Sequence, residues 1–208
     1  LLDSGRTELA LSMFGIKPAT SGKILRNGQE VAIKTPQDAM AQQIGFVPED
    51  RLSEGLFLTQ SIADNNIISK IDDIKAKNGT FDRTMRQEIV DKWVKDLAIA
   101  TPDANNNANT LSGGNQQRIV LAKWLATNPD VLILNGPTVG VDIGSKHDIH
   151  AILQQLARES GMGVIIISDD LPEVLQNCSR VLVLKDGKIV HEASTDGLTE
   201  KEILDHMM

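Results

Sequence analysis

The sequence predicts an α/β protein with a mainly parallel sheet, and two observations carry that prediction. Strand-like and helix-like patterns alternate along the 208 residues. Two of the strand-like runs, 131–134 and 164–167, contain only Val, Ile and Leu. Such runs without polar alternation are typical of parallel strands that helices cover on both faces. Because aromatic residues make up only 3% of the chain, we expect Val, Ile and Leu to form the core.

Turn and cap residues place the first elements. Asn27 and Gly28 suit the turn of a hairpin, since both turn positions need a positive φ. Thr35 followed by Pro36 and Asp38 is typical of a helix start. The expected elements are a helix at 6–14 that ends at Gly15, a hairpin at 22–33, a helix from Thr35 and a short strand at 44–47.

Residues 61–110 predict a helical insertion. Met85, Ile89, Trp93 and Leu97 recur every four residues, which is the mark of an amphipathic helix. Residues 103–110 are polar and rich in turn formers, and predict a loop. We expect one domain over 1–208 that includes this helical subdomain.

The alternation resumes after residue 110. Asp186 and Gly187 predict a second hairpin turn, and a small antiparallel part beside the parallel sheet. The expected elements are helices at about 115–127 and 145–159, strands at 131–134 and 164–167, a hairpin at 180–192 and a terminal helix at 199–207.

Composition excludes several classes of protein. The formal net charge is −7, whereas a protein that wraps nucleic acid needs a basic surface, so we expect no nucleic-acid partner. The single cysteine, Cys178, excludes a disulfide framework and fits small apolar packing. No apolar run reaches the roughly 20 residues of a membrane helix, and we expect no signal peptide. The chain opens on Leu1 without a Met, so we expect it to be truncated at its N-terminus.

Residues 1–7 resemble the end of the phosphate-binding pattern G-x-x-x-x-G-K-[ST]. That pattern needs glycines so that backbone N–H groups can surround phosphate oxygens, a Lys for the β- and γ-phosphates, and a hydroxyl for Mg²⁺. Gly5 and Thr7 fit, Arg6 replaces the Lys, and the first Gly would precede Leu1. The alternative is an ordinary turn before a helix.

A second phosphate motif begins at Leu111. Ser112, Gly113 and Gly114 open a helix whose exposed N–H groups and positive dipole end would bind an anion. The alternative is a capped helix with a flexible lead-in, which Ser112 and the apolar residues Ile119, Leu121, Trp124 and Leu125 would suit equally.

The string LSGGNQQ at 111–117 resembles the signature motif of ABC-type ATPases, which have a P-loop NTPase core. Other segments match that family in order and spacing across 1–192. They are 131–138 (Walker B strand and exit), 140–142 (D-loop), 45–51 (Q-loop) and 168–170 (switch histidine position).

Four strings narrow the resemblance: GRTEL at 5–9, PEDR at 48–51, LSGGNQQ at 111–117 and GVDIGSK at 140–146. Together they resemble the C-terminal ATP-binding half of tandem ATPases that drive monosaccharide importers of the ribose, galactose, xylose or autoinducer-2 type. The resemblance implies ATP and Mg²⁺ as cofactors, and as partners an N-terminal ABC half, permease subunits and, indirectly, a periplasmic sugar-binding protein. It also implies a peripheral place on the cytoplasmic face of the bacterial inner membrane. The residues that would contact ATP are Ser4, Gly5, Arg6, Thr7, Leu111, Ser112, Gly113, Gly114, Gln116 and Asp142, with Thr7 the metal candidate.

Four positions depart from a working ATPase of this family. Asn135 and Gly136 stand where the family usually keeps Asp and Glu, although Mg²⁺ prefers carboxylate and water oxygens. Glu49 replaces the Q-loop Gln, and Asp169 replaces the switch His, so both add negative charge near a triphosphate. The alternatives are a helix cap at Asp169–Asp170 and a surface ion pair within 49–51. No intact catalytic residue is therefore expected.

The pattern of kept and lost motifs predicts that this half supplies its signature to a partner's site while its own site hydrolyses ATP weakly or not at all. Two other hypotheses stay open: a non-catalytic nucleotide-binding half of the same machine, and a soluble ABC protein of translation or DNA repair. His147, His150, His191 and His206 are expected to be surface residues without a role.

Overall fold

Three parallel strands form the central sheet in the computed structural model of the chain, which describes residues 4–75 and 80–207. They are β3 (Ile44–Val47), β4 (Val131–Asn135) and β5 (Gly163–Ile167). β4 lies in the middle, with Val131 opposite both Ile44 and Gly163. β3 and β4 are buried, and for β4 this burial was predicted, whereas the same prediction for β5 was wrong. β5 is only partly covered, because among the described residues it has a strand partner on one edge alone.

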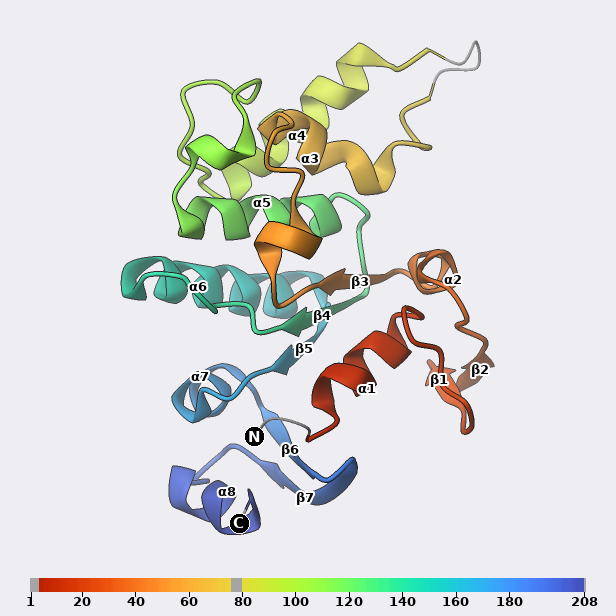
Figure 1. Cartoon of the computed structure of the whole chain (residues 1–208), viewed down its shortest axis with the longest axis vertical. Helices are drawn as coiled ribbons and strands as arrows, with labels where there is room; N and C mark the ends of the chain where they lie inside the picture. Colours follow the sequence, from red (N-terminus) through yellow and green to blue (C-terminus); the bar gives the residue numbers. More distant parts are fainter. Residues whose placement is uncertain (1–3, 76–79, 208) are drawn as a thin grey trace.

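Four helices pack around this sheet (Figure 1). α1 packs against β4 and β5, α5 and α2 against β3, and α6 against β5. Phe14, at the end of α1, stacks on Phe46 of β3 and meets Trp124 of α5 edge-on, with ring centroids 5.2 Å apart in both pairs. The scarce aromatic residues thus join both sides of the sheet. The helices are α1 (Arg6–Met13), α2 (Pro36–Ala41), α5 (Gly113–Leu125) and α6 (Ile143–Ser160).

The predicted helical segments lie above α5 in Figure 1. They are α3 (Ile62–Ile67), the 3₁₀ turns η2 (Ile68–Lys70) and η3 (Ala108–Thr110), and α4 (Arg83–Asp96). Ala63, Ile67, Ile74 and Val90 form their own small core. α5 lies between this core and the sheet, and its residues 116–125 are all buried. α5 therefore has no solvent face along that stretch.

Both predicted hairpins are present. β1 (Ile24–Arg26) pairs with β2 (Gln29–Val31), and β6 (Arg180–Lys185) with β7 (Lys188–Ser194). The turn residues Asn27, Gly28, Asp186 and Gly187 all have positive φ, as the turn argument requires. The last helix, α8 (Glu200–Met207), packs against β6, and its Ile203 is buried with Val174, Val181 and Val183.

One element was not predicted: η1 (Arg51–Gly55), a π-helical turn that follows β3. α7 (Leu171–Asn177) follows β5, where the sequence offered a helix cap at Asp169–Asp170 as one alternative. Thr35 does cap α2 through a complete capping box with Asp38, as predicted. Cys178 is partly buried against the C-terminal core, and burial raises the pKa of its thiol, which fits the predicted packing role.

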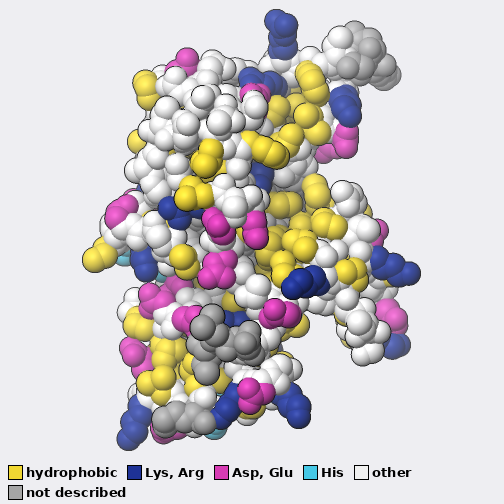
Figure 2. Space-filling model, viewed as in Figure 1, with side chains coloured by type: hydrophobic (Ala, Val, Ile, Leu, Met, Phe, Trp, Pro, Cys, Tyr) yellow, Lys and Arg dark blue, Asp and Glu magenta, His cyan; other side chains and the backbone are white. Residues whose placement is uncertain are grey.

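The face drawn in Figure 2 mixes apolar, acidic and basic side chains, and the Lys and Arg side chains lie scattered over it. Exposed apolar side chains include Leu52, Phe57 and Ile68. Within residues 4–75 and 80–207, no helix combines the length and apolarity that crossing a membrane requires.

Candidate functional site

The phosphate loop is held in place by the turn of the second hairpin. Gly5 has φ 88° and precedes α1, and no side chain caps the first turn of that helix. The N–H of Gly187 donates to the carbonyl oxygen of Ser4 at 3.0 Å. A Cβ atom on Gly5 would lie 3.0 Å from Cα of Gly187, so this position needs glycine both for its φ and for space. The hydroxyl of Ser4 is buried without a hydrogen-bond partner.

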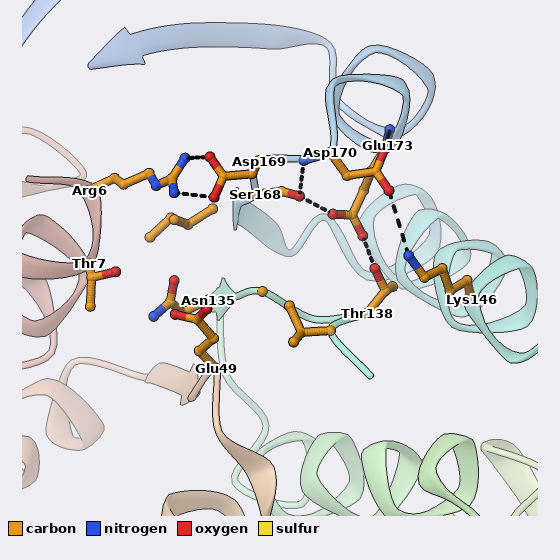
Figure 3. A pocket seen from close by; sticks show the side chains of 13 residues that line it. Arg6, Thr7, Glu49, Asn135, Thr138, Lys146, Ser168, Asp169, Asp170 and Glu173 are labelled. Atoms are coloured by element: carbon orange, nitrogen blue, oxygen red, sulfur yellow. Dashed lines mark hydrogen bonds and ion pairs between the residues drawn. The ribbon is translucent and has the colours of Figure 1, made fainter. Parts of the chain in front are cut away.

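A cavity of about 170 Å³ opens beside this loop, at the carboxyl ends of β3, β4 and β5. Ligands of open parallel sheets bind at such ends. Figure 3 shows side chains from α1, α6, α7 and the strand ends turned toward this space. The lining residues are Arg6, Thr7, Glu49, Asn135, Gly136, Thr138, Val139, Lys146, Ile167, Ser168, Asp169, Asp170 and Glu173.

Arg6 and Asp169 form a two-pronged ion pair across the cavity (Figure 3). The hydrogen bond from Arg6, with its positive charge, holds the pKa of Asp169 below its ordinary value. The helix cap predicted at Asp169–Asp170 is correct for Asp170 alone, which accepts from the N–H of Glu173 at 3.1 Å. Asp170 also lies 3.6 Å from the ammonium of Lys146. The cavity therefore already pairs its two basic side chains with carboxylates.

Glu173 is a residue of this site that the sequence argument missed. Its side chain is only 3% exposed. It accepts hydrogen bonds from Thr138 at 2.8 Å and from Ser168, and its Oε1 lies 2.7 Å from Nε2 of His150. Glu173 thus joins the ends of β4 and β5 to α6. In the sequence it is only the third residue after a helix cap, and nothing there signals burial.

The expectation that all four histidines lie on the surface was wrong for His150. Its side chain is 14% exposed, and the amide of Asn177 lies 3.2 Å from its second ring nitrogen. Burial lowers the pKa of His150, although the carboxylate of Glu173 opposes that shift. His191 and His206 stack on each other, with ring centroids 3.8 Å apart.

The positions that depart from the family pattern meet in this cavity. Asn135 is 5% exposed, and Glu49 is exposed. The side chains of both lie at the cavity with that of Thr7 (Figure 3). A Cβ atom on Gly136, which has φ 60°, would lie 3.1 Å from Cγ of Glu49. The structure thus places Glu49 directly against the position that lacks a side chain.

Arg51 does not form the surface ion pair predicted within 49–51. Its guanidinium donates to the carbonyl oxygens of Val139 and Gly140 at 2.7 and 3.0 Å. Asp50 instead caps η1 by accepting from the N–H groups of Leu52 and Ser53. Local sequence could not show this, because the carbonyl partners of Arg51 come from the loop after β4.

The signature begins α5, where Ser112 is the cap residue but makes no side-chain cap bond. The amide of Asn115 donates to the Ser112 hydroxyl at 3.1 Å and accepts from the N–H of Ala100 at 2.8 Å. A Cβ atom on Gly114 would lie 2.5 Å from Cβ of Ser145, so the glycine permits close contact with α6. The alternative of an ordinary capped helix is therefore without the side-chain hydrogen bond that Ser112 would make as its cap.

The remaining predicted ATP contacts have structural partners of their own. Leu111 packs against the main core, and Gln116 is buried with its amide 3.4 Å from the carbonyl oxygen of Ala108. Asp142 caps α6 by accepting from the N–H and hydroxyl of Ser145, which lowers the pKa of Asp142. Neither Asp142 nor any of residues 111–117 lines the cavity beside Arg6.

A left-handed glycine before an uncapped helix, at the carboxyl ends of parallel strands, is typical of a phosphate-binding loop. The family model for ABC transporters matches residues 4–139. The chain belongs to this family as one of its ATP-binding domains. It is 40% identical over 204 residues to the ribose import ATP-binding protein RbsA of Bacillus licheniformis, covering 98% of this chain and 41% of that protein.

Other relatives agree with this assignment. A putative ribose/galactose/methyl galactoside import ATP-binding protein of Halalkalibacterium halodurans is 37% identical, over 99% of this chain and 39% of its own length. The chain thus spans about two fifths of the curated relatives it matches. Solved structures share the fold: cbiO1 of Clostridium perfringens (TM-score 0.78, 24% identity, 99% and 79% of the chains) and a dimeric cassette bound to ADP and phosphate (0.76, 23%, 94% and 82%).

The residues present fit an ATP phosphate chain. The free N–H groups of the first turn of α1, the guanidinium of Arg6 and the unpartnered Ser4 hydroxyl are donors that suit anionic oxygens. The described residues hold no group of three or more His, Cys, Asp or Glu side chains suited to a metal. Mg²⁺ at nucleotide sites commonly takes part of its ligands from phosphates.

Proposed function

We propose that this chain is the ATP-binding domain of an ABC importer for a monosaccharide, and the C-terminal half of a tandem ATPase. In this proposal its signature completes a nucleotide site on the N-terminal half, while its own phosphate loop forms a weaker site. The relatives named for ribose and galactoside import support the sugar class, and the solved dimer with ADP and phosphate supports the pairing of two domains.

The separation of the two phosphate motifs carries this proposal. The cavity beside Arg6 includes none of residues 111–117. A nucleotide held by the phosphate loop therefore gains no signature contact within one chain. Each motif is complete only against the complementary motif of a second domain, which fits two composite sites of unequal quality.

Two variants of the full-length protein test the assignment of roles. Ser112→Arg places a charge at the start of α5 and should abolish ATP turnover, whereas Arg6→Ala should leave most of it. Ser160→Arg, at the exposed end of α6, is the control for added charge. If Arg6→Ala abolishes turnover and Ser112→Arg does not, the proposal is wrong.

A half that binds nucleotide without hydrolysing it is the second candidate, and Asn135 and Gly136 favour it. Asn135→Asp with Gly136→Glu should restore some hydrolysis if the remaining site is intact. Because Gly136 has φ 60° and a Cβ there would lie 2.9 Å from Cγ2 of Val139, the second change also strains the loop. Thermal melting of each single variant separates that strain from the chemistry.

The cellular setting follows from the same proposal. The domain would act on the cytoplasmic face of the inner membrane, bound to permease subunits that receive sugar from a periplasmic binding protein. Co-purification of the full-length protein with its permease from detergent extracts tests this. Recovery of the protein only in the soluble fraction, free of permease, would contradict it.

A further inference from the structure

His150, Asn177 and Glu173 form a hydrogen-bonded group behind the cavity, where α6 meets α7. Nε2 of His150 lies 2.7 Å from Oε1 of Glu173, and Nδ1 of His150 lies 3.2 Å from Nδ2 of Asn177. The amide nitrogen of Asn177 also donates to the backbone carbonyl oxygen of Glu173 at 2.8 Å, and its amide oxygen accepts from Gln154 at 2.8 Å. Both ring nitrogens of His150 and both amide atoms of Asn177 thus have partners.

These partners decide which ring nitrogen of His150 carries the proton. The backbone carbonyl of Glu173 can only accept a hydrogen bond, so the amide nitrogen of Asn177 must face it. The same nitrogen then offers its second hydrogen to Nδ1 of His150, which must accept it. The proton of the neutral ring therefore lies on Nε2 and is donated to the Glu173 carboxylate. The network is complete only when His150 is neutral.

Protonation of His150 opposes this arrangement. A proton on Nδ1 would meet an N–H of Asn177, so that two donors face each other. Turning the amide over would set its oxygen against the carbonyl oxygen of Glu173. The side chain of His150 is only 14% exposed, so little water reaches the ring to accept the added proton. An imidazolium therefore needs α6 and α7 to move apart at this contact.

The charges that act on His150 come from the two helices that meet there. Burial is the largest influence, and it lowers the pKa of His150. From α7 and its cap, Glu173 and Asp170 favour the charged ring, whereas His147 and Lys146 of α6 disfavour it. The pairs of opposite influence leave the neutral ring as the favoured form.

Glu173 links the state of His150 to the cavity. Its carboxylate also accepts from the hydroxyl of Thr138, in the loop after β4, and from that of Ser168, at the end of β5 (Figure 3). Thr138, Ser168 and Glu173 all line the cavity, and Ser168 directly precedes Asp169, which pairs across it. A shift of Glu173 therefore moves the ends of two strands that form the cavity wall.

We propose that His150 is a positioning residue that acts through Glu173: its neutral form holds the cavity in the shape that binds nucleotide, and its protonation weakens that binding. This inference rests on the proposed function, because it needs a nucleotide at this phosphate loop. Nucleotide and proton then compete, so that nucleotide expels the proton from His150 and acid lowers the affinity for nucleotide. The domain is thereby sensitive to a fall in the pH around it.

Proton release on nucleotide binding tests this in the full-length protein. Isothermal titration calorimetry with ADP, in buffers of different ionisation enthalpy, counts the protons released at about pH 5.5, below the ordinary histidine pKa of about 6.5. His150→Gln offers a donor to Glu173 and an acceptor to Asn177 but does not titrate. The wild type should release up to about one proton more than His150→Gln. Its Kd for ADP should also rise more steeply on acidification, by at most about tenfold per pH unit, the limit for one linked proton.

His147→Gln is the matched control, because it removes an exposed histidine from the same helix. It should keep the proton release of the wild type. Equal release by the wild type and His150→Gln would overturn the inference, and so would an equal loss of release in the control. Thermal melting checks that each variant is folded.

Asn177→Asp tests the same network from the other side. A carboxylate facing Nδ1 accepts from the protonated ring, so an imidazolium now completes the network and the loss of ADP affinity in acid should disappear. A wild-type pH profile in this variant would also overturn the inference. Failure of the proposed function looks different: Arg6→Ala would then leave the amount of bound ADP unchanged.

Discussion

The ion pair between Arg6 and Asp169 makes a testable claim about nucleotide affinity. The guanidinium that should meet the phosphates is held by a carboxylate on the opposite side of the cavity, so a nucleotide must displace that carboxylate. Asp169→Asn removes the charge and keeps the size of the side chain. We expect this variant to bind ADP and ATP more tightly than the wild type.

The exposure of the pair sets the magnitude. The side chain of Asp169 is 60% exposed and that of Arg6 is 25% exposed. Exposed ion pairs contribute roughly 0.2–1 kcal/mol, and two-pronged geometry favours the upper end. Release of about 1 kcal/mol corresponds to about a fivefold lower Kd, because about 1.4 kcal/mol is tenfold. Removing a carboxylate close to the phosphates acts in the same direction.

Isothermal titration calorimetry with ADP at two salt concentrations measures this effect. The gain in nucleotide affinity should shrink as the salt concentration rises, because salt screens exposed charges, with a screening length of about 10 Å at 0.1 M. Asp196→Asn, an exposed acid outside the cavity lining, controls for the change in net charge. An unchanged or higher Kd for Asp169→Asn, or an equal gain in the control, would refute the reasoning.

Three further predictions concern stability. Burial lowers the pKa of Lys123 to about 8; the unfolded chain then binds more protons between pH 8 and about 10.5. The free energy of unfolding of the wild-type protein, measured by urea titration, should therefore rise over that pH window by about 3 kcal/mol relative to Lys123→Met. Gly114→Ala should cost about 1–3 kcal/mol through overpacking, whereas Gly144→Ala, whose Cβ would meet nothing closer than 3.5 Å, should not destabilise. Glu173→Gln should lower stability by about 1–3 kcal/mol, measured the same way, because its donors lose a charged acceptor.

Local signals predicted most elements well. The strands β4 and β5, the turns at Asn27–Gly28 and Asp186–Gly187, and the cap at Thr35 were each predicted from residues close together in the chain. The missed element η1 lacks such a signal, because a five-residue π-helical turn has no side-chain period. For α7 the sequence offered only a cap, since the helix has seven residues and a Pro in its first turn.

Tertiary partners were beyond the sequence argument. The motifs identified Arg6, Glu49, Asn135 and Asp169 as site residues, and the structure gathers these four at one cavity. Which of them pair, and which stay unpartnered, depends on elements more than a hundred residues apart. Three points stay predictions: the unequal roles of the two nucleotide sites, the residues that contact ATP, and the binding of a metal.

The same principle explains α5. The basic side chains of this helix are buried together with its apolar ones. Arg118 donates to the carbonyl oxygens of Leu97 and Ala98, and Lys123 donates to that of Gly55. A periodicity argument assigns such polar residues to the solvent face, because the local sequence does not show their distant acceptors.

The bond between the N–H of Gly187 and the carbonyl oxygen of Ser4 has a consequence for biosynthesis. Ser4, in the phosphate loop, takes this support from a turn that lies far later in the sequence, between β6 and β7. A nascent chain that stops short of the second hairpin lacks the surface on which Gly5 rests. We therefore expect nucleotide binding at this loop to depend on the pairing of β6 with β7.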